Sequence, residues 1–154
     1  MRIGIGEIGA MRSEGEILSS GIGSCVLVIL YDPETKVGGI AHILLPDEKY
    51  SRKVSDRNRF PRPAITNLLS EMERLGADRS RIFARLVGGS SMFNTDRHEP
   101  IGDKNVAACR RILNELGIPI RAEDTGGNWG RSVSLDIKTG RVRITTYRIG
   151  IKEL

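Results

Sequence analysis

A cysteine and a histidine are the residues whose types and spacing suggest chemistry in this sequence. Cys25 opens an almost continuous apolar run (residues 25–31), and His42 lies within a second one (37–45). The segment Asp-Pro-Glu-Thr-Lys between the runs is typical of a turn, so the runs are predicted to form a β-hairpin. If the turn is centred on the Pro-Glu step, Cys25 lies directly opposite His42, with Cβ atoms about 5 Å apart. An imidazole at that distance can take the thiol proton and leave a nucleophilic thiolate.

A simpler interpretation competes with this dyad. A register slip of one residue would put the two side chains on opposite faces of the sheet. From pairing alone, a small buried Cys25 and a hydrogen-bonded core His42 are favoured, because free cysteine is among the most buried residue types. Cys109 lies on the apolar face of a predicted helix and is interpreted as such a core thiol. His98, in the loop TDRHEP, is predicted to be exposed.

A short segment with two glycines (residues 19–24, SSGIGS) precedes the cysteine. It lacks the third glycine of GxGxxG and the GK[ST] ending of a P-loop, so it is a weak candidate for a phosphate loop. The better interpretation is a turn that brings backbone N–H groups close to the thiol. Gly23 and Ser24 are therefore candidate substrate-binding residues, whose N–H groups would hold an oxyanion.

The elements that must position these residues follow from hydrophobic periodicity. Neither run of the hairpin alternates with polar residues, which indicates strands covered on both faces. The predicted elements are mostly strands, with two helices between them along the chain, which is typical of an α+β fold. We expect a single layered domain (1–154) of mostly antiparallel or mixed β-sheet packed with two main helices. Strands are expected at 2–8, 16–19, 25–31, 37–45, 81–87, 118–123, 132–138 and 141–148, and helices at 64–75 and 103–116.

Composition narrows the class of protein. A chain of 154 residues is long enough for one ordinary hydrophobic core. With two cysteines, no CxxC and no paired histidines, neither a disulfide framework nor a metal site is indicated. The longest uncharged stretch (17–31) is shorter than the roughly 20 residues of a membrane helix. The N-terminus is too charged for a signal peptide, so a cytoplasmic protein without membrane insertion is expected.

Positive charge is concentrated in one segment. The chain has 24 Lys and Arg against 19 Asp and Glu, a net charge of +5. This segment could bind phosphates of a nucleic acid, form a solvated loop, or attract an acidic protein surface. Only Tyr50 and Phe60 are aromatic nearby, which argues against a platform for stacking bases. The basic residues are Lys49, Arg52, Lys53, Arg57, Arg59 and Arg62, opposed by Asp56.

Several motifs in order resemble one family. The run GIGSCVLVILYDPETKVGGIAHILLPD resembles the signature of the CheD family of chemoreceptor glutamine deamidases. That signature is a glycine-flanked Ser-Cys, an apolar strand, Asp-Pro and GG-x-x-H-x-x-LP. The likeness covers nearly the whole chain and overturns the interpretation of Cys25 and His42 as core residues. It continues in GGSSMF (88–93), IGDKN (101–105), GIPI (117–120) and DTGGNWGR (124–131).

The resemblance implies a papain-like arrangement on the β-hairpin. Cys25 matches the family's nucleophile and His42 its general base. The third member of the family's site is a hydroxyl residue, usually Thr, and Ser19 stands at that position, with Ser20 beside it as the other possibility. A second departure is Lys104, where the family more often has Arg. In the later motifs, the glycine pairs are interpreted as turns, with Asp124 and Arg131 placed to pair across one of them.

The resemblance also implies a reaction and its partners. The expected activity is that of a protein-glutamine glutaminase, which converts specific Gln side chains of methyl-accepting chemotaxis receptors to Glu through a cysteine thioester. This reaction needs no metal or organic cofactor. The expected partners are the cytoplasmic domains of these receptors and a CheC-type phosphatase. Nucleic acid is not expected, and the basic segment is then better explained by an acidic protein partner. The alternative is a non-catalytic chemotaxis regulator that binds receptors and the phosphatase.

Overall fold

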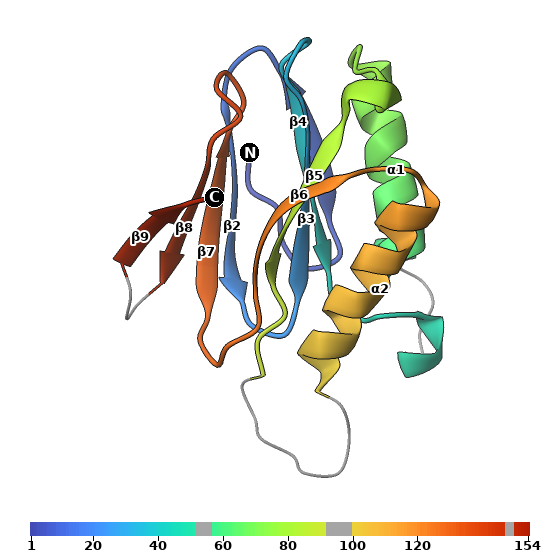
Figure 1. The fold of residues 1–154 in the computed structure, drawn as a ribbon, viewed down its shortest axis with the longest axis vertical. Helices are drawn as coiled ribbons and strands as arrows, with labels where there is room; N and C mark the ends of the chain where they lie inside the picture. The colour runs from blue at the N-terminus through green and yellow to red at the C-terminus, as the bar shows by residue number, and fades with distance from the viewer. Residues whose placement is uncertain (52–56, 92–99, 147–149) are drawn as a thin grey trace.

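The computed structural model describes residues 1–51, 57–91, 100–146 and 150–154 (Figure 1). Strands and two α-helices make up most of this part of the chain. In chain order the elements are β1 (Ile8–Arg12), β2 (Glu16–Ile22), β3 (Val26–Asp32), β4 (Val37–Ile43), the 3₁₀ turns Glu48–Tyr50 and Arg57–Arg59, α1 (Pro61–Arg74), the 3₁₀ turn Arg79–Arg81, β5 (Phe83–Gly88), α2 (Ile101–Glu115), β6 (Ile120–Thr125), β7 (Arg131–Asp136), β8 (Val142–Thr146) and β9 (Gly150–Glu153).

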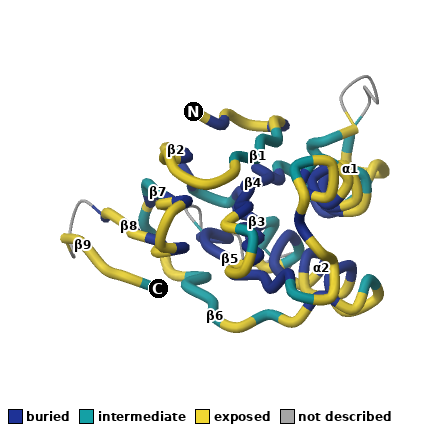
Figure 2. Tube along the Cα trace, turned by 90° about the horizontal axis from the view of Figure 1, so that it is seen from above, coloured by how far each residue is buried: buried dark blue, intermediate teal, exposed yellow. Residues whose placement is uncertain are grey.

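The elements form three layers, which confirms the predicted α+β class. The described strands make a five-stranded sheet, in the order β1-β4-β3-β5-β6, and a four-stranded sheet, in the order β2-β7-β8-β9. All neighbouring strands are antiparallel except β5 and β6, which are parallel and joined through α2. Both helices cover one face of the five-stranded sheet, and the four-stranded sheet lies against its other face (Figure 2).

The central hairpin separates two hydrophobic cores. Every residue of β3 and β4 is buried, as the unbroken apolar runs predict. Because side chains alternate along a strand, Val26 and Val28 face the helices, whereas Leu27 and Ile29 face the other sheet. Neither α1 nor α2 is long and apolar enough to cross a membrane.

The ends of the chain differ most from the sequence-based prediction. Only a bridge between Arg2 and Leu18 is strand-like in the first seven residues, and β1 begins at Ile8. Residues 4–7 turn instead, with Gly6 at φ +75° and the Glu7 side chain accepting a hydrogen bond from the Gly4 N–H. Alternating Gly and Ile therefore encodes a turn here and not a strand. The predicted strand 141–148 corresponds to β8 at Val142–Thr146, residues 147 and 148 lie outside the described residues, and a further strand that was not predicted, β9, comes last.

Candidate active site

The hairpin brings Cys25 and His42 to the same face, but not directly opposite each other. In the observed register Leu27 is the partner of His42, and Val26 pairs with Ile43. Cys25 lies just before β3, two residues away from the predicted pairing. Because side chains alternate with a period of two, this shift leaves both residues on the face toward the four-stranded sheet. They are diagonal neighbours at the open end of the hairpin, and both are buried.

Ser19 approaches His42 from the other sheet. It lies on β2 with its side chain pointing inward, and its Oγ is 3.1 Å from Nδ1 of His42. The same hydroxyl donates its single hydrogen to the Ile3 carbonyl, at 2.6 Å. Ser19 therefore accepts a hydrogen bond from His42 Nδ1–H, which leaves Nε2 as the proton acceptor of the neutral ring. Nε2 is buried without a partner among the described residues. Ser20 is exposed, so Ser19 is the residue that contacts the imidazole.

Burial favours the neutral form of both the Cys25 and the His42 side chain. It raises the pKa of the Cys25 thiol, a shift only partly offset by the residue's own backbone N–H. Burial also lowers the pKa of His42, against the opposing effects of the Ile3 carbonyl and the Glu7 carboxylate. Burial thus favours a thiol and a neutral imidazole over an ion pair of the two side chains.

Three consecutive backbone carbonyls, those of residues 23–25, accept hydrogen bonds that hold the segment around the candidate nucleophile. The Gly23 carbonyl accepts from the Ser90 N–H at 2.9 Å, and the Cys25 carbonyl from the Gly89 N–H at 2.7 Å. Between them, the Ser24 carbonyl accepts from the Asn105 side chain at 2.9 Å. Because C=O and N–H point in opposite directions across a planar trans peptide, the N–H groups of Ser24 and Cys25 point away from these donors.

Glycine makes this close approach possible at the end of β5. Gly88 has φ +116°, and a Cβ there would collide with the Cys25 carbonyl and with Ile22. A Cβ on Gly102, in the first turn of α2, would likewise collide with the backbone of Gly89 and Ser90. The motifs GGSS and IGDKN therefore pack backbone against backbone beside the cysteine segment.

A buried arginine, Arg131, holds the side chain of Ser90 by a hydrogen bond. Arg131 donates to the Ser90 hydroxyl at 2.8 Å and to the Gly126 carbonyl at 2.9 Å. It also pairs with Asp124 at 3.3 Å, as predicted from the sequence. Half-buried Trp129 lies beside the guanidinium, 5.2 Å from ring centroid to Cζ, and its carbonyl accepts from the Ser90 hydroxyl. The motif DTGGNWGR thus encodes this support.

The other candidates lie elsewhere. Cys109 is fully buried on α2, and burial raises the pKa of its thiol. His98 lies outside the described residues. Sequence reasoning assigned no role to Asn105 or Ser90, although both contact the cysteine segment. Their positions inside the motifs IGDKN and GGSS were the signal that could have identified them.

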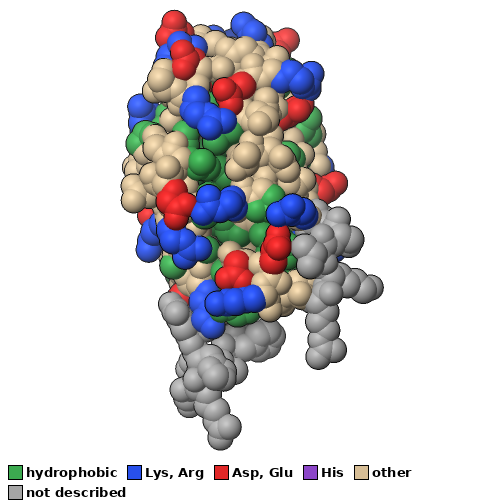
Figure 3. Space-filling model, turned by 90° about the vertical axis from the view of Figure 1, so that its right-hand side faces the viewer, with side chains coloured by type: hydrophobic (Ala, Val, Ile, Leu, Met, Phe, Trp, Pro, Cys, Tyr) green, Lys and Arg blue, Asp and Glu red, His purple; other side chains and the backbone are tan. Residues whose placement is uncertain are grey.

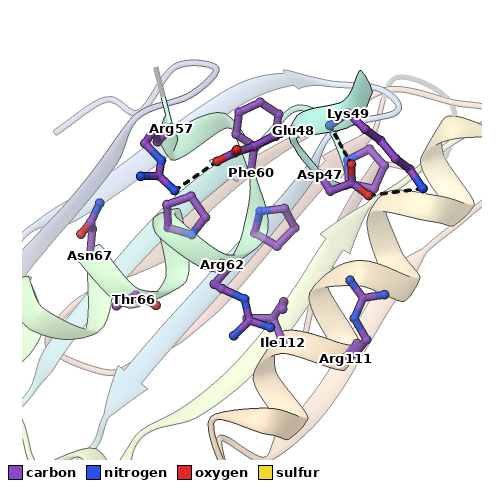
Figure 4. A pocket seen from close by; sticks show the side chains of 13 residues that line it. Asp47, Glu48, Lys49, Arg57, Phe60, Arg62, Thr66, Asn67, Arg111 and Ile112 are labelled. Atoms are coloured by element: carbon purple, nitrogen blue, oxygen red, sulfur yellow. Dashed lines mark hydrogen bonds and ion pairs between the residues drawn. The ribbon is translucent and has the colours of Figure 1, made fainter. Parts of the chain in front are cut away.

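The basic segment borders a groove of about 690 Å³ between α1, α2 and the chain after β4 (Figure 4). Its cations are largely paired: Arg57 with Glu48 at 3.1 Å and Arg62 with Glu115 at 2.5 Å. Arg52 and Lys53, which complete the predicted patch, lie outside the described residues. On this side of the molecule basic and acidic side chains are interspersed among apolar ones (Figure 3). The described surface here is therefore mixed in charge.

Comparison with known proteins shows the family. A family model described as CheD chemotactic sensory transduction matches residues 44–146, two thirds of the chain. The chain belongs to the CheD family. Ser19, Cys25 and His42 precede the region matched by the model, but full-length CheD relatives span them.

Curated CheD relatives cover almost the whole chain. Those of Caldanaerobacter subterraneus subsp. tengcongensis and Moorella thermoacetica are 40% and 42% identical, over 99% and 95% of this chain and 96% and 90% of their own length. A third, from Clostridium tetani, is 41% identical over 99% of this chain and 94% of its own. Each of these CheD proteins is named a probable chemoreceptor glutamine deamidase.

Among solved structures, the hypothetical protein YfiH of Bacillus licheniformis aligns with 71% of this CheD chain and 46% of its own, at 17% identity and a TM-score of 0.44. A likeness of this size indicates neither a shared function nor a shared site.

Proposed function

We propose that this CheD protein is a chemoreceptor glutamine deamidase with Cys25 as its nucleophile and His42 as its general base. The observation that carries the proposal is the Ser19–His42 hydrogen bond, which leaves the buried Nε2 as a proton acceptor on the face that carries Cys25. The names of the relatives supply the substrate, a glutamine side chain of a chemoreceptor, which the family resemblance narrows to a methyl-accepting chemotaxis receptor.

The reaction begins with proton transfer from the Cys25 thiol to His42 Nε2. The thiolate attacks the carboxamide carbon, and a C–S bond forms as the carbonyl oxygen becomes an oxyanion. His42 then gives its proton to the amide nitrogen of the substrate. As the oxyanion collapses to a carbonyl, the C–N bond breaks, ammonia departs and a thioester to Cys25 remains. His42 next takes a proton from water, which attacks the thioester. Glutamate is released, and the proton returns to the thiol.

Backbone N–H groups would stabilise the oxyanion. The N–H groups of Ser24 and Cys25 point away from the donors that hold the adjacent carbonyls. Their direction is set by the three hydrogen bonds to the carbonyls of residues 23–25. Donors held rigidly where charge develops stabilise a transition state without further reorganisation. Gly23 contributes through its carbonyl, which accepts from the Ser90 N–H and so holds the Gly23–Ser24 peptide that carries the Ser24 N–H. Ser19 positions the imidazole and does not touch the substrate.

The product carries one more negative charge than the substrate. On a receptor helix this charge changes repulsion between neighbouring side chains, and so the balance between signalling states. The net charge of +5 on this protein favours encounter with acidic receptor helices or with an acidic partner such as a CheC-type phosphatase.

The test is incubation with the cytoplasmic fragment of a methyl-accepting chemotaxis receptor, followed by peptide mass spectrometry. We expect conversion of specific Gln residues to Glu by the wild-type protein and by Cys109→Ala, which removes only the core thiol. Cys25→Ala should give none. Absence of conversion by the wild type, together with retained receptor binding, would instead identify a non-catalytic regulator, and equal conversion by Cys25→Ala would exclude Cys25 as the nucleophile.

A further inference from the structure

One buried amide joins the two chain segments that carry the candidate catalytic residues. Asn105, on the first turns of α2, is fully buried. Its Nδ2 donates to the Ser24 carbonyl at 2.9 Å and to the Leu44 carbonyl at 3.0 Å. Ser24 directly precedes Cys25, and Leu44 follows His42 by two residues. The last paired residues of the hairpin at this end are Val26 and Ile43. Asn105 thus bridges the strands just beyond the point where their ladder ends.

The chemistry of this bridge selects the amide side chain. Both bridged atoms are carbonyl oxygens, which accept hydrogen bonds and donate none, so the bridging atom must carry two hydrogens. The Nδ2 atom of Asn105 carries two hydrogens, and its side chain is long enough to bring this atom within hydrogen-bond distance of both carbonyls. Its Oδ1 is buried without a partner among the described residues. A buried acceptor left unpaired carries an energetic cost, which the double bridge offsets.

The bridge determines two separate geometric quantities. It fixes the distance between the segment of Cys25 and the end of the strand that carries His42. It also fixes the plane of the Ser24–Cys25 peptide, because the Ser24 carbonyl is held by Asn105 and the Cys25 N–H of the same peptide points the opposite way. The distance between the two segments controls proton transfer from thiol to imidazole. The plane of the Ser24–Cys25 peptide sets the direction in which the Cys25 N–H can donate to an oxyanion.

We infer that Asn105 is a positioning residue for deamidation, which sets the spacing of Cys25 and His42 and the direction of the Cys25 N–H. This inference rests on the proposed function and deepens it. Asn105 touches no substrate. Its loss should lower kcat while leaving KM near the wild-type value, because the receptor surface is unchanged and only the reacting groups are misplaced.

The experiment compares Asn105→Ala and Asn105→Asp with two controls on the same helix. Aspartate keeps the shape of asparagine but lacks the two amide hydrogens. Leu113→Ala removes a fully buried core side chain away from the bridged carbonyls, and Asn114→Ala removes an exposed amide. Three experiments are done on each variant: deamidation kinetics for kcat and KM, thermal unfolding for its midpoint, and the pH profile of Cys25 alkylation by iodoacetamide.

Both Asn105 variants should lose kcat by roughly 10- to 100-fold at an unchanged KM, the scale of a misplaced catalytic group. Their Cys25 alkylation profiles should move to higher pH, toward that of His42→Ala, because a displaced imidazole no longer takes the thiol proton as the cysteine is alkylated. Leu113→Ala should unfold at lower temperature with kcat and alkylation profile unchanged, and Asn114→Ala should resemble the wild type throughout.

A folded Asn105→Asp with wild-type kcat and alkylation profile would overturn the inference. So would an equal loss of kcat in Leu113→Ala, because the effect would then follow from stability alone. If the wild type itself deamidates no receptor fragment, the proposed function fails. In that case the alkylation profiles of wild type and Asn105→Asp still decide whether Asn105 positions Cys25 against His42: a shift supports it and identical profiles refute it.

Discussion

Ser19 determines which nitrogen of His42 carries the hydrogen in the neutral ring. Its hydroxyl has one hydrogen, already donated to the Ile3 carbonyl, and so it can only accept from Nδ1. A serine lacks the β-methyl that restricts threonine rotamers, but the Ile3 carbonyl supplies a comparable restriction here. The N-terminal segment is therefore part of the support of the imidazole.

Replacing Ser19 by alanine should impair catalysis more than folding. The Nδ1–H of His42 then loses its acceptor, the ring can rotate or change tautomer, and kcat should fall on the order of 100-fold. Ser20→Ala, one residue along and exposed, is the matched control and should keep wild-type kcat. Deamidation assays on the two variants and their thermal unfolding give the comparison. Equal rates for Ser19→Ala and wild type would contradict the assigned role.

At the scale of elements, the end of β5 determines how closely the cysteine segment can approach the sheet. Gly88 pairs with Val26 and lies against the Cys25 carbonyl. Its positive φ and the absence of a side chain are both required there. Strand β5 thus packs directly against the segment that carries Cys25, the proposed nucleophile.

Gly88→Ala should therefore lower both stability and activity. The strained φ and the collision with Cys25 each disfavour the native geometry, and we expect a loss of about 1–3 kcal/mol in the free energy of unfolding. Gly117→Ala is the matched control, since Gly117 has φ +73° with open space around its Cα and lies at the far end of α2. It should lose stability through φ alone and keep its kcat. Urea unfolding and deamidation assays measure both, and an unchanged kcat in Gly88→Ala would argue against a role of this packing in catalysis.

At the scale of the whole molecule, one buried carboxylate connects the hairpin turn to the chain that leads into β5. Asp32 accepts from the N–H groups of Glu34 and Asp78 and pairs with Arg81 at 3.1 Å. Burial by itself would raise the pKa of Asp32, but the hydrogen bonds from Arg81, Asp78 and Glu34 outweigh it and lower the pKa to about 2. The folded state therefore binds this proton more weakly than the unfolded chain, where an Asp has a pKa near 3.9.

Because the folded pKa is depressed, Asp32 stabilises the protein above about pH 4, and this contribution is lost as the pH falls toward 2. Asp32→Asn should thus cost about 2 kcal/mol in the free energy of unfolding at pH 7. The difference from wild type should shrink as the pH falls from 4 to 2. Urea unfolding across this range is the measurement, with exposed Glu14→Gln as a control that should change little. A difference independent of pH would show that packing, and not ionisation, accounts for the loss.

The predicted hairpin register was wrong by two residues for a local reason. The Asp32 side chain accepts from the Glu34 N–H, and Lys36 adopts φ +54°, so the turn takes four residues and its centre moves along the chain. Neither feature is visible in hydrophobic periodicity. An even shift keeps every side chain on its face, and for that reason Cys25 and His42 still share one face of the sheet.

The sequence by itself determined the class of fold, the central hairpin, the family and the face shared by Cys25 and His42, because these depend on local periodicity and on ordered motifs. The tertiary structure decided which serine contacts the imidazole, since Ser19 belongs to a different sheet. It also decided that Asn105, far along the chain on α2, bridges the segments of Cys25 and His42. Contacts between layers depend on how separate elements pack, and no spacing along one chain encodes that packing directly.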